Sequence, residues 1–179
     1  MALSATIYKF SLSISDLNRD YYDSLQLTVA QHPSESEERM MVRVLAYCLN
    51  ASEALAFTKG LSTPDTPDIW AKSLDDQINL WVEVGEPSAD KIKKATRQSK
   101  QVKVYSFNSK SDVWWRQEQK KLSALDVTII QFPWAQIQQL VELISRTVNI
   151  SVTITGESIF LNADNGDREI HWLRLQDNE

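Results

Sequence analysis

The sequence predicts one mixed α/β (α+β) domain, in which helices flank a central mixed sheet and antiparallel strands from both ends of the chain extend it. Three observations lead to this prediction. Strand-like alternation opens and closes the chain, helical spacing of apolar residues follows the first pair of strands, and strands then alternate with helices. The 179 residues, 42% of them hydrophobic and 24% charged, suit a single core.

The first predicted elements are a hairpin and a helix. Residues 6–14 alternate apolar and polar side chains as a half-buried strand does, and a second strand around 25–29 returns through a polar turn. Ser34 is expected to cap the helix that follows, with Glu37 closing a capping box three residues later. Apolar residues at helical spacing predict that this helix buries one stripe and ends near Asn50.

Short strands and a lysine-rich helix make up the middle of the chain. Strands are predicted near 55–59, 68–73 and 78–84, with a proline-rich turn between the first two. A helix over roughly 88–99 and a strand at 102–105 come next. The order from the first helix onward is therefore a helix, three strands, a helix and a strand.

The remaining segments extend this core. A helix is predicted around 111–121, a strand at 127–132 and a further helix near 134–146. The chain then ends in a three-strand meander, in which Asn165 and Gly166 form a hairpin turn.

Composition excludes several classes of function. No apolar run approaches the ~18 residues of a membrane span, and the amino terminus lacks the order of a signal peptide, so we expect a cytoplasmic protein with no membrane partner. Cys48 is the only cysteine and the histidines are two, which argues against disulfides and zinc sites. The four glycines form no nucleotide-binding loop, so we expect no organic cofactor, and any metal would bind to oxygen.

Positive charge is concentrated in one segment. The segment from Lys91 to Lys121 contains ten basic residues and two acidic ones. Its local charge is therefore +8, in a chain whose net charge is −5. Such a segment can attract a polyanion, or it can simply be a solvated surface. Trp114 and Trp115 lie within it and would stack on unpaired bases if exposed, or belong to the core if buried.

Three acidic residues are candidates for chemistry. Glu83 lies in an apolar strand, where it either points to solvent or needs a cation, hydrogen bonds or a proton. Asp68 follows Pro67 and is either a turn residue or the second acid of a pair that one divalent ion can bind. Glu38 lies at the edge of the helix's buried stripe, although the helix dipole alone would favour acids there.

Several segments resemble the YaeQ family of small bacterial proteins, whose fold is a variant of the PD-(D/E)XK nuclease core. They are Ala5-Thr6-Ile7-Tyr8-Lys9, His32-Pro33-Ser34-Glu35 with Glu38-Arg39-Met40-Met41, Trp81-Val82-Glu83-Val84-Gly85 with Pro87, Ile92-Lys93-Lys94-Ala95, and Trp114-Trp115. The resemblance implies a single domain over 1–179, with a nuclease-like core at 33–107 and β extensions at 1–32 and 148–176.

The nuclease resemblance also implies a metal site and a reaction. Glu38, Asp68 and Glu83 would hold Mg²⁺ or Mn²⁺ for the hydrolysis of phosphodiesters in nucleic acid. If these acids crowd one site without metal, burial and like charge should raise the pKa of at least one carboxyl. The alternative is a catalytically inactive nuclease-fold module that binds nucleic acid or a protein partner.

One position departs from the nuclease pattern. Gly85 stands where that pattern has a lysine, so a cation must enter the site from elsewhere. Lys94 is the expected replacement, with Lys91 or Lys72 as alternatives. The expected catalytic residues are therefore Asp68, Glu83 and Lys94, and the expected nucleic-acid-binding residues are Lys91, Lys93, Arg97 and Trp114.

Overall fold

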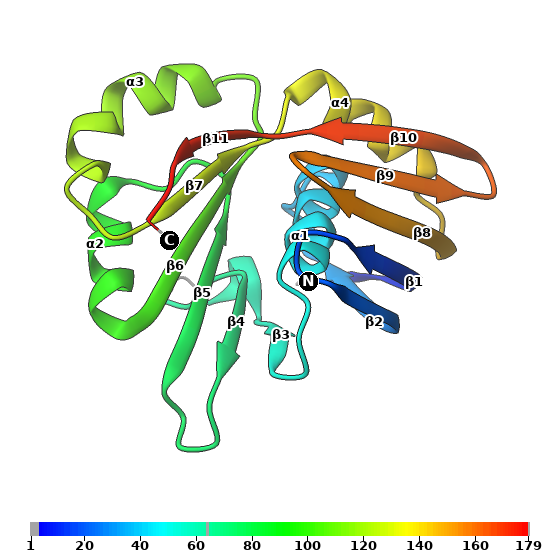
Figure 1. The fold of residues 1–179 in the computed structure, drawn as a ribbon, viewed down its shortest axis with the longest axis horizontal. Helices are drawn as coiled ribbons and strands as arrows, with labels where there is room; N and C mark the ends of the chain where they lie inside the picture. Colours follow the sequence, from blue (N-terminus) through cyan, green and yellow to red (C-terminus); the bar gives the residue numbers. More distant parts are fainter. Residues whose placement is uncertain (1–3, 64, 179) are drawn as a thin grey trace.

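The computed structural model describes residues 4–63 and 65–178, and these form layers (Figure 1). Two separate sheets lie on either side of helix α1, and helices α2 and α3 cover the other face of the larger sheet. The prediction of a mixed α/β fold with helices flanking a mixed sheet is confirmed.

The larger sheet is six-stranded, in the order β11-β7-β6-β5-β4-β3. Its central strands β5, β6 and β7 pair in parallel, while β3, β4 and β11 join antiparallel. The strand bounds are β3 Leu55–Phe57, β4 Ile69–Lys72, β5 Ile78–Val84, β6 Ser99–Ser106, β7 Thr128–Gln131 and β11 Leu173–Gln176. β11 therefore belongs to this sheet, although it lies within the segment 148–176 that the sequence assigned to an extension.

The predicted extension is a five-stranded sheet of its own, in the order β10-β9-β8-β1-β2. An amino-terminal hairpin and a carboxyl-terminal meander supply its strands, and the pair that joins them, β1 and β8, is parallel and not antiparallel as predicted. The bounds are β1 Thr6–Asp16, β2 Tyr21–Gln31, β8 Thr147–Thr155, β9 Ser158–Ala163 and β10 Gly166–His171.

Helix α1 is buried between the two sheets. All its residues from Met40 to Cys48 are buried, because apolar side chains from both sheets pack against it. The sequence predicted a single buried stripe, since it did not reveal that a second sheet covers the other side. The helix bounds are α1 Glu37–Leu49, α2 Ala89–Gln98, α3 Ser111–Leu122 and α4 Trp134–Leu140, with 3-10 turns at Gly60–Ser62 and Val141–Leu143.

The cap of α1 lies two residues later than predicted. Ser36, not Ser34, accepts a hydrogen bond from the backbone N–H of Arg39. Ser34 instead belongs to a turn, where its N–H donates to Nδ1 of His32. None of the helices in the described part of the chain is long and apolar enough to cross a membrane.

Candidate functional site

Asp68 and Glu83 meet at one end of the β4–β5 pair. These strands are antiparallel with Ile69 opposite Val82, and Asp68 lies one residue before β4, beside the end of β5 that carries Glu83. The N–H of Asp68 donates to the carbonyl of Val82 at 3.0 Å, which ties Asp68 to this end of β5. Both acids are buried, with 4% and 3% of their surface exposed. The structure therefore brings together the two acids that the strand pattern paired.

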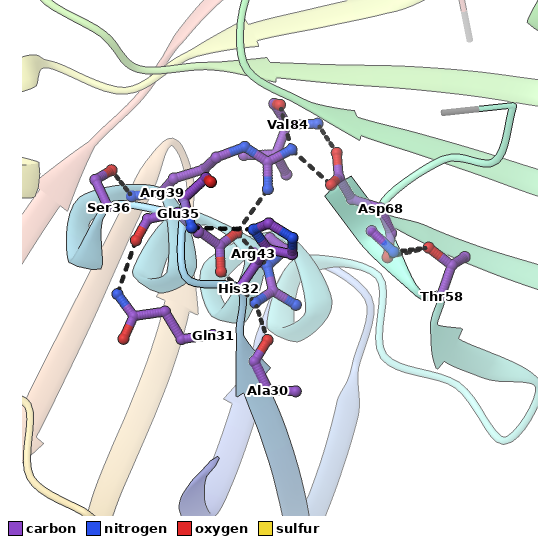
Figure 2. Close-up of polar contacts among 12 residues, drawn as sticks. Ala30, Gln31, His32, Glu35, Ser36, Arg39, Arg43, Thr58, Asp68 and Val84 are labelled. Atoms are coloured by element: carbon purple, nitrogen blue, oxygen red, sulfur yellow. Dashed lines mark hydrogen bonds and ion pairs between the residues drawn. The ribbon is translucent and has the colours of Figure 1, made fainter. Parts of the chain in front are cut away.

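Arg39 of α1 neutralises Asp68 (Figure 2). Its Nη2 donates to Oδ1 of Asp68 at 2.6 Å and to the carbonyl of Val84 at 3.2 Å, while the N–H of Val84 donates to Oδ2 of Asp68 at 2.8 Å. Burial alone would lower the pKa of Arg39, but the charges and hydrogen bonds of Asp68 and Glu35 raise it above its ordinary value. Each carboxylate oxygen of Asp68 therefore accepts a hydrogen bond, and the one from Arg39 is charge-assisted.

Glu35 connects Arg39 to a second arginine. Oε2 of Glu35 accepts from Nη1 of Arg39 at 2.6 Å and from Nε of Arg43 at 2.9 Å, and its Oε1 accepts from Nη2 of Arg43 at 2.6 Å. Sequence reasoning missed this network. Part of the signal was present, because Arg39 and Arg43 lie four residues apart on one face of α1, and Glu35 directly precedes the cap of that helix.

The carboxylate of Glu83 has weaker hydrogen-bond and ion-pair partners than that of Asp68. Nε1 of Trp81 donates to Oε1 at 2.9 Å, and Nζ of Lys91 lies 3.3 Å from Oε2. The Lys91 side chain is 42% exposed, so water weakens this ion pair. Burial, and then the charge of Asp68, raise the pKa of Glu83 above its ordinary value, against the opposing effects of Lys91 and Trp81. A raised carboxyl pKa, expected from crowded acids, is therefore present.

A cleft of about 410 Å³ opens beside α2, next to Glu83. Trp81 and Lys91, the two residues that contact the Glu83 carboxylate, line it, and Lys94 lines it as well. The lysine in contact with an acid is Lys91, one helical turn before the expected Lys94. Lys72 lies elsewhere, with its Nζ 4.0 Å from the centre of the Trp70 ring.

The predicted three-acid site does not form. Within 4–63 and 65–178, no group of three His, Cys, Asp or Glu side chains is placed to hold a metal ion. Glu38 is partly exposed, and α1 presents the next residue, Arg39, to Asp68. Neighbouring helical residues point about 100° apart, so only one of the two can face that acid.

The residues expected to bind nucleic acid divide into two groups. Lys93 and Arg97 are exposed on α2, and Lys91 is half-exposed. Trp114 is buried, and its Nε1 donates to the carbonyl of Pro87 at 2.7 Å. The prediction that Trp114 stacks on bases is therefore wrong, because α3 packs this ring into the hydrophobic cluster it shares with α2.

The carboxylates of Asp68 and Glu83 suit a smaller metal site than the sequence predicted, with two acidic ligands for a divalent ion. Mg²⁺ is commonly held by one or two carboxylates, with water and substrate phosphates in its other positions. Asp68 and Glu83 supply two such groups on adjoining strands. Arg39 competes for Oδ1 of Asp68, so the fit is to a two-carboxylate site and not to the three-acid cage expected from the sequence.

Known proteins with similar sequences and structures show which family this chain resembles. The family model described as "YaeQ protein" matches residues 1–172. Among curated relatives, the uncharacterized protein YaeQ of Salmonella typhi is 39% identical and that of Escherichia coli K12 is 36% identical, each over 98% of both chains.

Two crystal structures have the same fold. The YaeQ protein of Xanthomonas axonopodis pv. citri superposes with a TM-score of 0.94 at 32% identity, covering 97% of this chain and 99% of its own. That of Pseudomonas syringae gives 0.92 at 37% identity, covering 97% of each chain. The agreement of family model, relatives and structures over nearly the full length shows that the chain belongs to the YaeQ family.

Proposed function

We propose that this protein binds the phosphate backbone of nucleic acid in the cleft beside α2 and hydrolyses phosphodiesters there with Mg²⁺ or Mn²⁺. One observation carries the proposal: two buried carboxylates, Asp68 and Glu83, lie at the same end of the β4–β5 pair, and contacts of Glu83 line a cleft that holds Lys91 and Lys94 together with Asp65 and Asp90. Buried acids with a raised pKa in a cleft are typical of functional sites.

Each residue of this site has a role that its contacts support. Asp68 and Glu83 would hold the divalent ion, which supplies a Lewis acid and lowers the pKa of a bound water. Nε1 of Trp81 orients the Glu83 carboxylate. Lys91 has a flexible four-carbon stem, so its ammonium can turn from Glu83 to a phosphate oxygen that enters the cleft.

The basic surface of α2 supports binding of a polyanion. Lys93, Lys94 and Arg97 are exposed on the helix that forms one wall of the cleft. Lysine and arginine side chains that neutralise phosphates give an affinity that falls steeply with salt. A nucleic-acid substrate also agrees with the cytoplasmic location expected from the sequence.

A second candidate function is binding without cleavage. The ion pair between Arg39 and Asp68 favours it, because a fixed cation already occupies one of the two expected metal ligands. In that case Arg39 and Lys91 neutralise the two acids, and the cleft serves only to hold the backbone.

Both functions are tested with labelled single- and double-stranded DNA and RNA, in Mn²⁺, Mg²⁺ or chelator. Glu83→Gln removes a proposed ligand, and Glu53→Gln, at an exposed acid, is the matched control. Cleavage that requires metal and is lost only in Glu83→Gln supports the nuclease. Saturable Mn²⁺ binding, followed by calorimetry, should be lost in the same variant.

Two other outcomes are informative. Nucleic-acid binding that persists in chelator, without cleavage under any condition, supports the second candidate. If the protein neither binds nor cleaves any of the four substrates, both proposals are wrong.

A further inference from the structure

A second pocket, of about 190 Å³, lies where the start of α1 meets the segment after β3. It is separate from the cleft beside α2, and the proposed function does not use it. The residues that matter to its chemistry are His32, Arg43, Phe57, Thr58, Lys59 and Leu61. His32 begins the His32-Pro33-Ser34-Glu35 segment, which stood out in the sequence and has no role in the proposed reaction.

Hydrogen bonds hold the Arg43 guanidinium in place through two of its three nitrogens. Only 5% of its surface is exposed, Nε and Nη2 donate to Glu35 and to the carbonyl of Ala30, and the guanidinium lies 5.4 Å from the centre of the Phe57 ring. Nη1 makes no hydrogen bond to any residue in the described ranges, and because it is not one of the buried unpaired atoms there, solvent reaches it. This nitrogen is a preorganised donor.

His32 offers a second donor in the same pocket. Its Nδ1 accepts a hydrogen bond from the N–H of Ser34 at 3.0 Å, so a neutral ring carries its proton on Nε2. Nε2 has no partner among residues 4–63 and 65–178. Figure 2 shows the His32 ring beside the Arg43 guanidinium, and both line the pocket.

The rest of the lining adds apolar surface. Phe57 and Leu61 are apolar, and Lys59 lines the pocket as well. Among the described residues that line the pocket, Glu35 is the one acid, and both its oxygens already accept from arginines. Thr58 is occupied too, since Oγ1 donates to the carbonyl of Pro67 and accepts from the N–H of Gly60.

We propose that this pocket binds a small oxyanion, a phosphate or a carboxylate, between Nη1 of Arg43 and Nε2 of His32. Two hydrogen-bond donors line one pocket, and the Glu35 carboxylate that also lines it is already bound by arginines, so the pocket favours an anion. The volume is below the ~300 Å³ at which pockets for drug-sized ligands begin, so the ligand is small.

The test is calorimetric titration with sodium phosphate, sulfate and acetate at constant ionic strength, with chloride as the reference. We expect one saturable site, and the relative affinities distinguish a phosphate from a carboxylate ligand. His32→Asn keeps an acceptor for the Ser34 N–H but removes the Nε2 donor, and should weaken binding about tenfold. Lys9→Gln, at an exposed cation on β1, is the control and should bind as the parent does.

A second variant keeps the test decisive if the turn around His32 is disturbed. Leu61→Trp, at an exposed position in the lining, fills the pocket and should abolish the saturable heat without changing the fold. Absence of a saturable site for every anion would overturn the proposal. Equal affinity in the parent, His32→Asn and Leu61→Trp would do so as well. Neither result bears on cleavage at the other site, because these variants leave Asp68 and Glu83 intact.

Discussion

Asp68 receives two short hydrogen bonds, one of them from an arginine of α1 that is held between two carboxylates. Glu83 receives an indole N–H and a longer contact from a half-exposed lysine of α2. The difference follows from the layers. Helix α1 is enclosed between two sheets and keeps its cation in place, whereas α2 lies on the outside and its lysine can move. Of these two neighbouring acids, the one whose cation comes from the outer helix is therefore the adaptable one.

The largest effect should come from removing the fixed cation. Arg39→Met leaves Glu35 with one arginine and Asp68 with none, both still buried. Breaking a buried ion pair from one side typically costs ~3–5 kcal/mol, and because Arg39 is 17% exposed we expect about 3 kcal/mol less unfolding free energy in urea.

The double variant Arg39→Met with Asp68→Asn sharpens this test. It should recover part of the loss, because the uncompensated charge at position 68 is gone. A loss below about 1 kcal/mol in the single variant would show that Asp68 is no more firmly compensated than Glu83.

Glu83→Gln should have a smaller effect of the opposite sign. The folded-state pKa of Glu83 lies above its ordinary 4.5, so the stability associated with its protonated form is present below that pH and is lost as the pH rises through the raised pKa. Glutamine does not ionise. We therefore expect the variant to melt at the same or a higher temperature than the parent at pH 7 in chelator, and to lose less stability between acidic and neutral pH.

Thermal melts from pH 4 to 8 measure this difference. A clear drop in melting temperature for Glu83→Gln at pH 7 would make Glu83 a structural acid like Asp68. The distinction between the two acids would then fail.

The smallest effects concern the two lysines of the cleft. Lys91→Met should cost about 1 kcal/mol or less at neutral pH, since the pair is partly exposed, and should raise the pKa of Glu83 further. Lys94→Met, one turn later, should change stability by no more than about 0.5 kcal/mol. Denaturation and NMR titration of the Glu83 carboxyl carbon measure both, and a larger effect for Lys94 would reverse the assignment.

Local regularities made much of this site predictable. The alternation along β5 and the proline before Asp68 placed the two acids on adjoining strands, because the pairing of neighbouring strands follows their local pattern. Their shared burial and the raised pKa follow from that placement.

The errors arose where distant segments decide the environment. Whether α1 turns Glu38 or Arg39 towards Asp68 depends on how the helix is rotated between two sheets, and the second sheet is built from both ends of the chain. Trp114 is buried because α3 packs beside α2, which its own sequence pattern does not show. The Ser34 error was local, since two serines two residues apart compete for one cap.

The parallel pairing of β1 with β8 also determines when the molecule can fold. Lys9 lies opposite Thr147, so the smaller sheet closes only after most of the chain has left the ribosome. Until then one face of the methionine-rich helix α1 is uncovered and β1 has a free edge, which is a template for pairing with other chains. Such long-range closure slows folding, so chains that stop before residue 147 should aggregate, and a chaperone that shields α1 would act on the first third of the nascent protein.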